Sequence, residues 1–237
     1  MLKIMLDPGH GQYGNRSPLD SSFYEGTNNY KFALVLKEAL LAYEGVEVLM
    51  TRNNISEDPS LSDRGAMAVK NGCDVFLSLH SNASSAPSAY GVEGYYSIST
   101  PDARGLLQGL CNVTVNNLPG SKVRRVTTKV SDGQDYYGVL RASKGIKYSA
   151  LIEMGFHTNP GELACIRLDE WHKVVAEQMA KTFSDFFGLK LKEVAPPTPV
   201  EPEEESALQV DFDELIARTK KIEEEVKDLA RLLESYR

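Results

Sequence analysis

Cysteine, histidine and long apolar runs are scarce in this sequence. Its three cysteines, Cys73, Cys111 and Cys165, are odd in number and widely spaced, which matches neither a disulfide framework nor a CxxC zinc site. We expect reduced, buried thiols, because free cysteine is among the most frequently buried residues. No apolar run approaches the roughly 20 residues of a transmembrane helix, and the N-terminus lacks the features of a secretory signal peptide. These absences predict a soluble protein, made in the cytoplasm without a signal peptide or a membrane span.

A general excess of positive charge is also absent. The chain has 33 acidic and 26 basic residues, a formal net charge of −7. This balance argues against a nucleic-acid binder that neutralises phosphates over a wide surface. Residues 191–237 hold 13 of the acidic residues but only 7 of the basic ones, so the first 190 residues are nearly neutral and most of the net charge belongs to the C-terminal region.

A segment rich in proline and glutamate marks the clearest boundary in the chain. Residues 195–206 read APPTPVEPEEES, which is the composition of an extended linker whose like charges repel one another. The sequence therefore predicts three parts: a catalytic domain at 1–190, a linker at 191–207 and a C-terminal helix at 208–237.

The C-terminal part carries a heptad pattern. Apolar and small residues alternate at spacings of four and three, which is typical of a coiled-coil seam. This pattern predicts a coiled-coil-like helix that pairs with a second copy and makes the protein a homo-oligomer. The alternative is a helix that docks the same stripe onto its own catalytic domain. The seam consists of Leu208, Phe212, Leu215, Thr219, Ile222, Val226, Leu229, Leu233 and Tyr236.

Within the first 190 residues, strand-like apolar runs alternate with helix-like stretches. This order predicts an α/β fold with a mixed, mostly parallel twisted sheet flanked by helices. In open sheets of this kind, ligands bind beyond the carboxyl ends of the strands. The expected strands are 2–6, 46–50, 74–79, 92–98 and 148–153, and the expected helices are 28–43, 61–70, 102–116, one beginning at Pro160, and 170–187.

Two of the four histidines follow predicted strands. His10 comes after the first strand, between Gly9 and Gly11, and His80 ends the third. Glu25 lies in the predicted loop before the first helix. Two imidazoles and one carboxylate form the ligand set of many catalytic zinc sites, which leave a fourth position open to water. The spacing alone leaves open the alternative that each histidine is only hydrogen-bonded.

Glu153 directly follows the apolar run Ala150–Ile152 at the end of another predicted strand. A carboxylate is costly at such a position unless it is paired or functional. A carboxyl group of raised pKa suits the transfer of a proton from zinc-bound water to a leaving amine. The alternative is a structural carboxylate that caps the next helix or pairs with Arg141.

Four motifs together resemble the zinc-dependent N-acetylmuramoyl-L-alanine amidases of the type 3 class. They are DPGHG at 7–11, Glu25, SLHSN at 78–82 and IEMGFHTNP at 152–160, and the resemblance covers about residues 1–188. It implies hydrolysis of the amide between N-acetylmuramic acid and L-alanine in peptidoglycan. It also implies one Zn²⁺ held by His10, Glu25 and His80, with Glu153 as the catalytic general base and acid.

The chain departs from the family pattern at two positions. Gln12 stands where the family commonly has a glycine, which changes the loop without removing a ligand. His157 stands where a small or apolar residue is usual, so no catalytic role is carried over to it.

Four other polar residues are weaker candidates. Arg141 is expected to contact the acidic peptide stem, or to form an ordinary ion pair. Asn82 is expected to orient the loop of its neighbour His80 or to contact substrate. We expect Asp7 to fix the turn and His172 to be structural.

The resemblance leaves the biological setting open. A phage or prophage endolysin, released when the membrane is permeabilised, would use this chemistry on the cell wall, and so would a host autolysin acting at cell lysis. A zinc peptidase that cuts within the peptide stem remains an alternative enzyme. A non-catalytic wall-binding protein on the same fold is expected to have lost a ligand or Glu153, and this chain keeps them all.

Overall fold

A computed structural model of the chain describes residues 1–193. The predicted linker lies mostly outside these residues, and the predicted helix at 208–237 lies wholly outside them. Leu191 and Lys192 still pair with the segment at 42–43, so the compact unit runs to Lys192.

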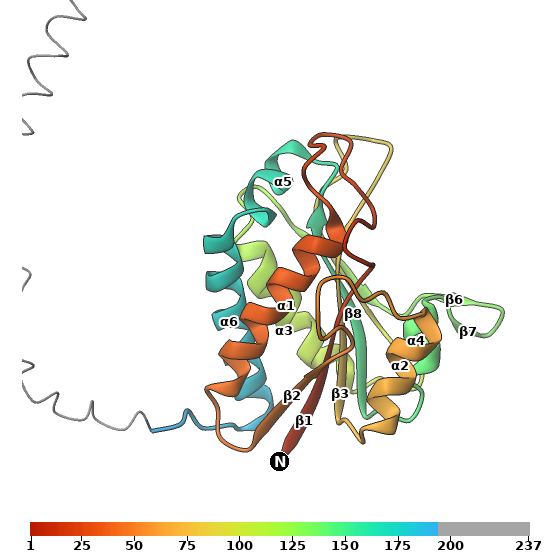
Figure 1. Ribbon diagram of the computed structural model, residues 1–237, viewed down its shortest axis with the longest axis vertical. Coiled ribbons are helices and arrows are strands. Elements are labelled where there is room, and N and C mark those ends of the chain that lie inside the picture. The colour runs from red at the N-terminus through yellow and green to blue at the C-terminus, as the bar shows by residue number, and fades with distance from the viewer. Residues whose placement is uncertain (194–237) are drawn as a thin grey trace, which may run out of the picture. The chain divides into compact units, whose positions relative to one another are not determined.

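The centre of the domain is a six-stranded sheet with strand order β2-β1-β3-β8-β4-β5. Neighbouring strands are parallel except β4 and β8, which are antiparallel. The fold class predicted from the sequence, a mixed and mostly parallel sheet flanked by helices, is therefore confirmed (Figure 1). The strands are β1 (Leu2–Pro8), β2 (Val46–Met50), β3 (Val75–Asn82), β4 (Val92–Tyr96), β5 (Val123–Thr127) and β8 (Tyr148–Phe156).

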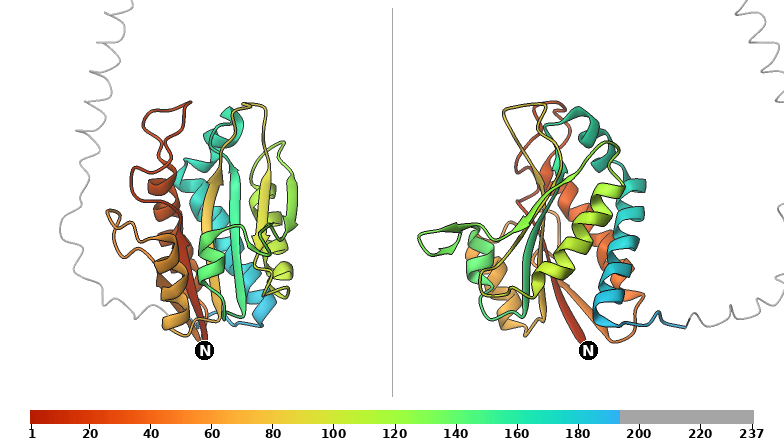
Figure 2. Two further views of the ribbon diagram at one scale, coloured as in Figure 1. Left: turned by 90° about the vertical axis from the view of Figure 1, so that its right-hand side faces the viewer. Right: turned by 180° about the vertical axis from the view of Figure 1, so that it is seen from behind.

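Helices cover both faces of this sheet. One face carries α1 (Glu25–Leu41), α3 (Ala103–Asn116) and α6 (Asp169–Phe187), with α5 (Pro160–Ile166) near the end of β8. The other face carries α2 (Leu61–Lys70) and α4 (Gly138–Ala142). A small hairpin of β6 (Val130–Ser131) and β7 (Gln134–Asp135) projects from this second face, whereas α3 and α6 pack side by side on the first (Figure 2).

The sequence-based boundaries differ from the structure where the site lies. The first helix begins at Glu25 rather than at residue 28, so Glu25 is helical and not in a loop. Strand β3 continues to Asn82 and β8 to Phe156, so His80 and Glu153 lie within strands and not at their ends. Both strands continue because neighbouring backbone groups still pair with them there.

The core has one apolar cluster on each face of the sheet. The larger packs α1, α3 and α6 against residues such as Leu6, Leu79 and Ile152, and the smaller packs α2 and α4 against Phe76 and Leu151. No helix among residues 1–193 combines the length and the apolar character needed to cross a bilayer.

The cysteines follow the sequence-based expectation in part. All three are free thiols, and Cys73 and Cys111 are buried as expected. Cys165 is only partly buried, so the expectation of burial is wrong for it. It lies on the short helix α5, and its side chain packs against the edge of the larger cluster rather than inside it.

Candidate metal centre and active site

The three predicted metal ligands lie together at one end of the sheet. His10, Glu25 and His80 each offer one ligand atom, and these atoms all lie within 4.8 Å of one another. His10 Nε2 is 3.3 Å from Glu25 Oε2, and His80 Nδ1 is 3.0 Å from Glu25 Oε1. The three residues come from the turn after β1, the first turn of α1 and strand β3, two residues before it ends.

Two glycines allow these segments to approach one another. A Cβ atom on Gly9 would lie 2.1 Å from the His80 ring, and one on Gly26 would lie 1.7 Å from the carbonyl oxygen of Gly11. No side chain fits at either position without displacing a ligand or its loop. His10 itself has φ of 61°, a left-handed conformation that costs energy in a residue other than glycine.

Glu25 is held as an anion. It is 1% exposed, and burial alone would raise its pKa. Hydrogen bonds with His10 and His80 outweigh burial and lower that pKa well below the usual range. The backbone N–H of Ser81 donates to Oε1 at 2.9 Å, and Asn29 Nδ2 donates to the same atom at 3.3 Å. The carboxylate is thus fixed in place and can offer an oxygen to a metal ion.

The Glu25 carboxylate also changes the pKa of His80. Burial would lower its pKa, but the hydrogen bond and charge of Glu25 raise it to about 9. This strong field favours a cation beside Glu25, either a proton or a metal ion. Two imidazoles and a carboxylate converging on one point are the donor set that Zn²⁺ prefers in catalytic sites, so the residues present fit that ion.

Glu153 lies on β8 beside this cluster. It is in register with His80 on the neighbouring strand β3, and residues paired in this way point to the same face of the sheet. Its Oε2 is buried and has no hydrogen-bond partner among residues 1–193. Burial is the main cause that raises the pKa of this carboxyl to about 7, so it exchanges a proton readily near neutral pH.

The structural alternatives considered for Glu153 do not match the contacts. The cap of the next helix is Asn159, whose side chain accepts from the N–H groups of Gly161 and Glu162. The Arg141 guanidinium donates to the carbonyl oxygens of Asp135 and Tyr136 at 2.7 and 2.8 Å. Glu153 therefore neither caps α5 nor pairs with Arg141.

Two buried arginines fix the loop that carries His10, and sequence reasoning did not single them out. Arg52 Nη1 and Arg64 Nη2 donate to the His10 carbonyl at 2.8 and 3.2 Å. Arg52 also donates to the carbonyl of Gly26, next to Glu25, at 2.9 Å, so one guanidinium ties two ligand segments together. The signal in the sequence was a cation on the buried stripe of a helix, since Arg64 is one turn before the buried Ala68.

The four weaker candidates differ in whether they lie beside the cluster of His10, Glu25 and His80. Asn82 is adjacent, and its Nδ2 donates to Glu93 Oε2 at 3.2 Å. Arg141 lines a different cavity, of about 380 Å³, together with Lys144. His172 is away from the site, with Nε2 2.9 Å from the Ile166 carbonyl, and is structural. Asp7 accepts hydrogen bonds from Thr51, Ser78 and Arg64 beneath the loop.

His157 is buried against the ligand shell. Its Nδ1 lies 3.0 Å from Ser81 Oγ and 3.9 Å from Glu25 Oε2, and its ring stacks on Phe23. Burial lowers its pKa, so it packs behind Glu25 as a neutral ring.

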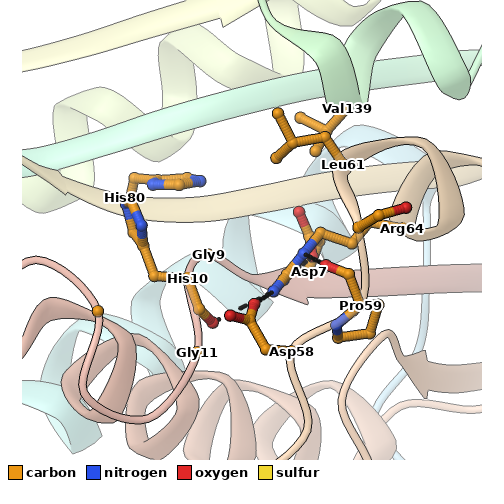
Figure 3. Close-up of a pocket in the computed structure, with 12 residues that line it drawn as sticks. Asp7, Gly9, His10, Gly11, Asp58, Pro59, Leu61, Arg64, His80 and Val139 are labelled. Carbon is orange, nitrogen blue, oxygen red and sulfur yellow. Dashed lines mark hydrogen bonds and ion pairs between the residues drawn. The ribbon is translucent and has the colours of Figure 1, made fainter.

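A pocket of about 320 Å³ opens beside the two histidines (Figure 3). His10 and His80 form one side of it, and Leu61 and Val139 form the other. Its floor comes from β1 and its far wall from the loop that leads into α2. A group bound there would lie next to His10 and His80.

Known proteins resemble this chain in sequence. Residues 4–184 match the family model described as N-acetylmuramoyl-L-alanine amidase. The chain is 36% identical over 193 residues to the sporulation-specific N-acetylmuramoyl-L-alanine amidase of Bacillus subtilis, covering 80% of this chain and 70% of that protein. It is 32% identical over 177 residues to the probable cell wall amidase LytH of Staphylococcus epidermidis, covering 74% of this chain and 54% of that protein.

A solved structure shows the same fold. The N-acetylmuramoyl-L-alanine amidase from Clostridium difficile 630 superposes with a TM-score of 0.66 at 26% identity, covering 79% of this chain and 97% of that one. The chain spans about half the length of the staphylococcal relatives that it matches. On the family match and the Bacillus relative, this chain belongs to the N-acetylmuramoyl-L-alanine amidase family.

Proposed function

We propose that the chain hydrolyses the amide bond between N-acetylmuramic acid and L-alanine in bacterial peptidoglycan, in a zinc-dependent reaction. The observation that carries this proposal is the cluster of His10, Glu25 and His80 beside Glu153, whose buried Oε2 has no partner among residues 1–193. Family membership supplies the bond that such a site would cut.

The metal has a defined place in this proposal. His10, Glu25 and His80 would hold Zn²⁺, which when bound supplies a Lewis acid for the carbonyl and acidifies a water molecule. The protein keeps the ligands in position through the Arg52 and Arg64 contacts to the His10 carbonyl. It keeps Glu25 ionised through hydrogen bonds that outweigh the cost of burial.

Glu153 carries the proton. Its carboxylate takes a proton from the attacking water, holds it on the buried carboxyl and delivers it to the nitrogen of the leaving L-alanine. One group performs both steps because its pKa, raised mainly by burial, lies close to neutral pH. Its register position beside His80 keeps the carboxyl next to the ligand cluster throughout.

Two further residues are proposed to contact the substrate. Asn82 would act from the rim of the cluster, where it already contacts Glu93. Arg141 would act from the neighbouring cavity, where its exposed side chain meets the base of the β6–β7 hairpin. Both an endolysin and an autolysin would use this activity to open the cell wall. Self-association through residues 208–237 also remains a proposal.

Product analysis tests the proposed reaction. Purified peptidoglycan is digested by the full chain with and without a zinc chelator, and the products are identified by mass spectrometry. We expect intact stem peptides with a free L-alanine amine, and a loss of activity with chelator that added zinc restores. New reducing sugars or cleaved stems would overturn the proposal, and the second outcome would identify a peptidase instead.

A further inference from the structure

Four charged side chains form a row across four adjacent strands. His80 on β3 pairs in register with Glu153 on β8, Glu153 pairs with Glu93 on β4, and Glu93 pairs with Arg125 on β5. Register partners point to the same face of a sheet. The row therefore runs from the metal ligands, through the proton-transfer group, to a cation at the edge of the sheet.

Glu93 is the residue of this row that the surrounding contacts hold most firmly. It is buried, with its side chain 8% exposed, and each carboxylate oxygen has polar partners. Arg124 Nε lies 2.6 Å from Oε1, and Tyr95 Oη donates to Oε2 at 2.6 Å. Arg125 Nε is 3.5 Å from Oε1. Glu93 thus holds the guanidinium of Arg125 by its Nε edge, and the Arg125 side chain is 51% exposed.

The outer edge of Arg125 is available for a ligand. None of the hydrogen bonds found within residues 1–193 involves its Nη atoms, and its one ion pair there uses Nε. A guanidinium with two free Nη groups matches the geometry of a carboxylate, which it binds through two parallel hydrogen bonds.

A second cation lies on the same side of the site. The Lys129 ammonium is 3.9 Å from the centre of the Tyr136 ring, 5.4 Å from that of Tyr137 and 5.9 Å from that of Tyr95. It has no carboxylate within ion-pair distance in the part of the chain that the structure describes. Because Tyr95 also donates to Glu93, both cations are attached to one rigid framework. Lys129 is near enough to Glu153 to oppose the rise of its pKa.

We propose that Arg125 and Lys129 form a subsite for a carboxylate of the peptide stem, on the amine side of the bond that is cut. This inference rests on the proposed function, and it states in which direction the substrate of that reaction binds. Strands lie about 4.8 Å apart, so β5 lies roughly 10 Å from β8. An extended peptide advances about 3.3 Å per residue, so an acidic residue within the first three positions of the stem reaches Arg125.

The sheet order supports this direction of binding. The pocket beside His10 lies over β1, on the opposite side of His80 from Glu93. It has room for the sugar and its lactyl group, whereas the exposed cations lie over β4 and β5. The substrate then crosses the strands with its glycan at β1 and its peptide at β5.

Two substrates that differ in one charge test the subsite. N-acetylmuramoyl-L-alanyl-D-glutamate is compared with its isoglutamine form, in which an amide replaces the first carboxylate of the stem. We expect the zinc-loaded wild type to have about a tenfold higher kcat/KM for the acid, as for one charge-assisted contact. Arg125→Gln and Lys129→Gln should each reduce this preference, measured as the ratio of the two kcat/KM values.

The control is Lys147→Gln. Lys147 also lies over a tyrosine ring, 5.4 Å from the centre of Tyr148, but at the opposite end of β8. The Lys147→Gln variant should keep the wild-type preference for the acid.

Two outcomes would overturn the subsite while leaving the proposed function intact. One is equal turnover of both substrates by the wild type. The other is an equal loss of activity on both substrates in Arg125→Gln and Lys129→Gln. Binding of both peptides to Glu153→Gln, measured by calorimetry, makes the same comparison without turnover. If the wild type cleaves neither these peptides nor purified peptidoglycan, the proposed function fails, and the subsite with it.

Discussion

Replacing Arg64 by methionine tests how strongly the domain depends on one buried cation. The Arg64 side chain is 2% exposed and lies on α2, facing the loop that carries His10. Five acceptors surround its guanidinium: Asp7 Oδ1 and Pro8 O at 2.8 Å, Asp58 Oδ1 and Pro59 O at 2.9 Å, and His10 O at 3.2 Å.

The expected loss follows from what remains after the substitution. Asp7 is fully buried, and within residues 1–193 its carboxylate then keeps the hydroxyl groups of Thr51 and Ser78, at 2.6 and 2.7 Å. A buried carboxylate that loses its cation typically costs about 3 to 5 kcal/mol. Asp58 adds little, because its side chain is 65% exposed and water replaces the lost contact. Methionine nearly preserves the side-chain volume, so the loss comes mainly from charge and hydrogen bonds rather than from a cavity.

Urea denaturation of the metal-free protein, followed by circular dichroism, measures this loss. We expect the free energy of unfolding to fall by about 3 to 5 kcal/mol at unchanged m-value. Lys70→Met is the matched control, since Lys70 is exposed at the end of the same helix. It should change stability by less than about 1 kcal/mol. If Arg64→Met and the control differ by less than about 1 kcal/mol, the reasoning from burial and charge is refuted.

Four other predictions follow from the site and the fold. Glu153→Gln should lower kcat by at least about a hundredfold and leave zinc affinity nearly unchanged. His80→Ala, in contrast, should lose zinc in a chelator competition. Full activity of Glu153→Gln would exclude the proton transfer assigned to Glu153. Burial raises the Glu153 pKa from 4.5 to about 7, so this group stabilises the metal-free fold at low pH and loses that contribution as pH rises through 7. Glu153→Gln should therefore gain stability relative to wild type between about pH 5 and pH 8. A difference in unfolding free energy that stays constant over this range would contradict the sign. Ser60→Ala should cost about 1 kcal/mol in urea denaturation, because Ser60 Oγ caps α2 at the Asp63 N–H, and no change would show that the cap is not needed. Light scattering should give a larger assembly for the full chain than for a chain ending at Lys192, and equal monomer masses would refute pairing through residues 208–237.

Much of the site could be predicted because its chemistry lies in short segments of the sequence. His10, Glu25, His80 and Glu153 occur in or beside short recognisable motifs. The strand pattern put His10, His80 and Glu153 at one edge of a sheet, whereas Glu25 was expected in a loop. The start of α1 was predicted too late because its N-cap is Tyr24, whose side chain makes no capping hydrogen bond. A helix that begins without Ser, Thr, Asp or Asn gives little local signal.

Other parts depend on contacts that no local pattern encodes. The segment at 117–147 contains β5, an edge strand with two adjacent arginines, and α4, which has only five residues. Neither is long or apolar enough to show a clear period. The His10 carbonyl and its donors on Arg52 and Arg64 are 42 and 54 residues apart in the sequence. Their roles become visible only when the strands are assembled.

The antiparallel pairing of β4 with β8 affects how the rim of the site can vary. Because β8 lies between β3 and β4, the connection at 83–91 passes over the end of β8 to join the strand of His80 to the strand of Glu93. It is fastened there by the hydrogen bonds of Ser84 to Thr158 and of Asn159 to Pro87. The register of the strands, and hence the positions of His80 and Glu153, depends on the ladder and not on this connection. The connection can therefore change in length, and the rim beside β8 with it, without moving His80 or Glu153.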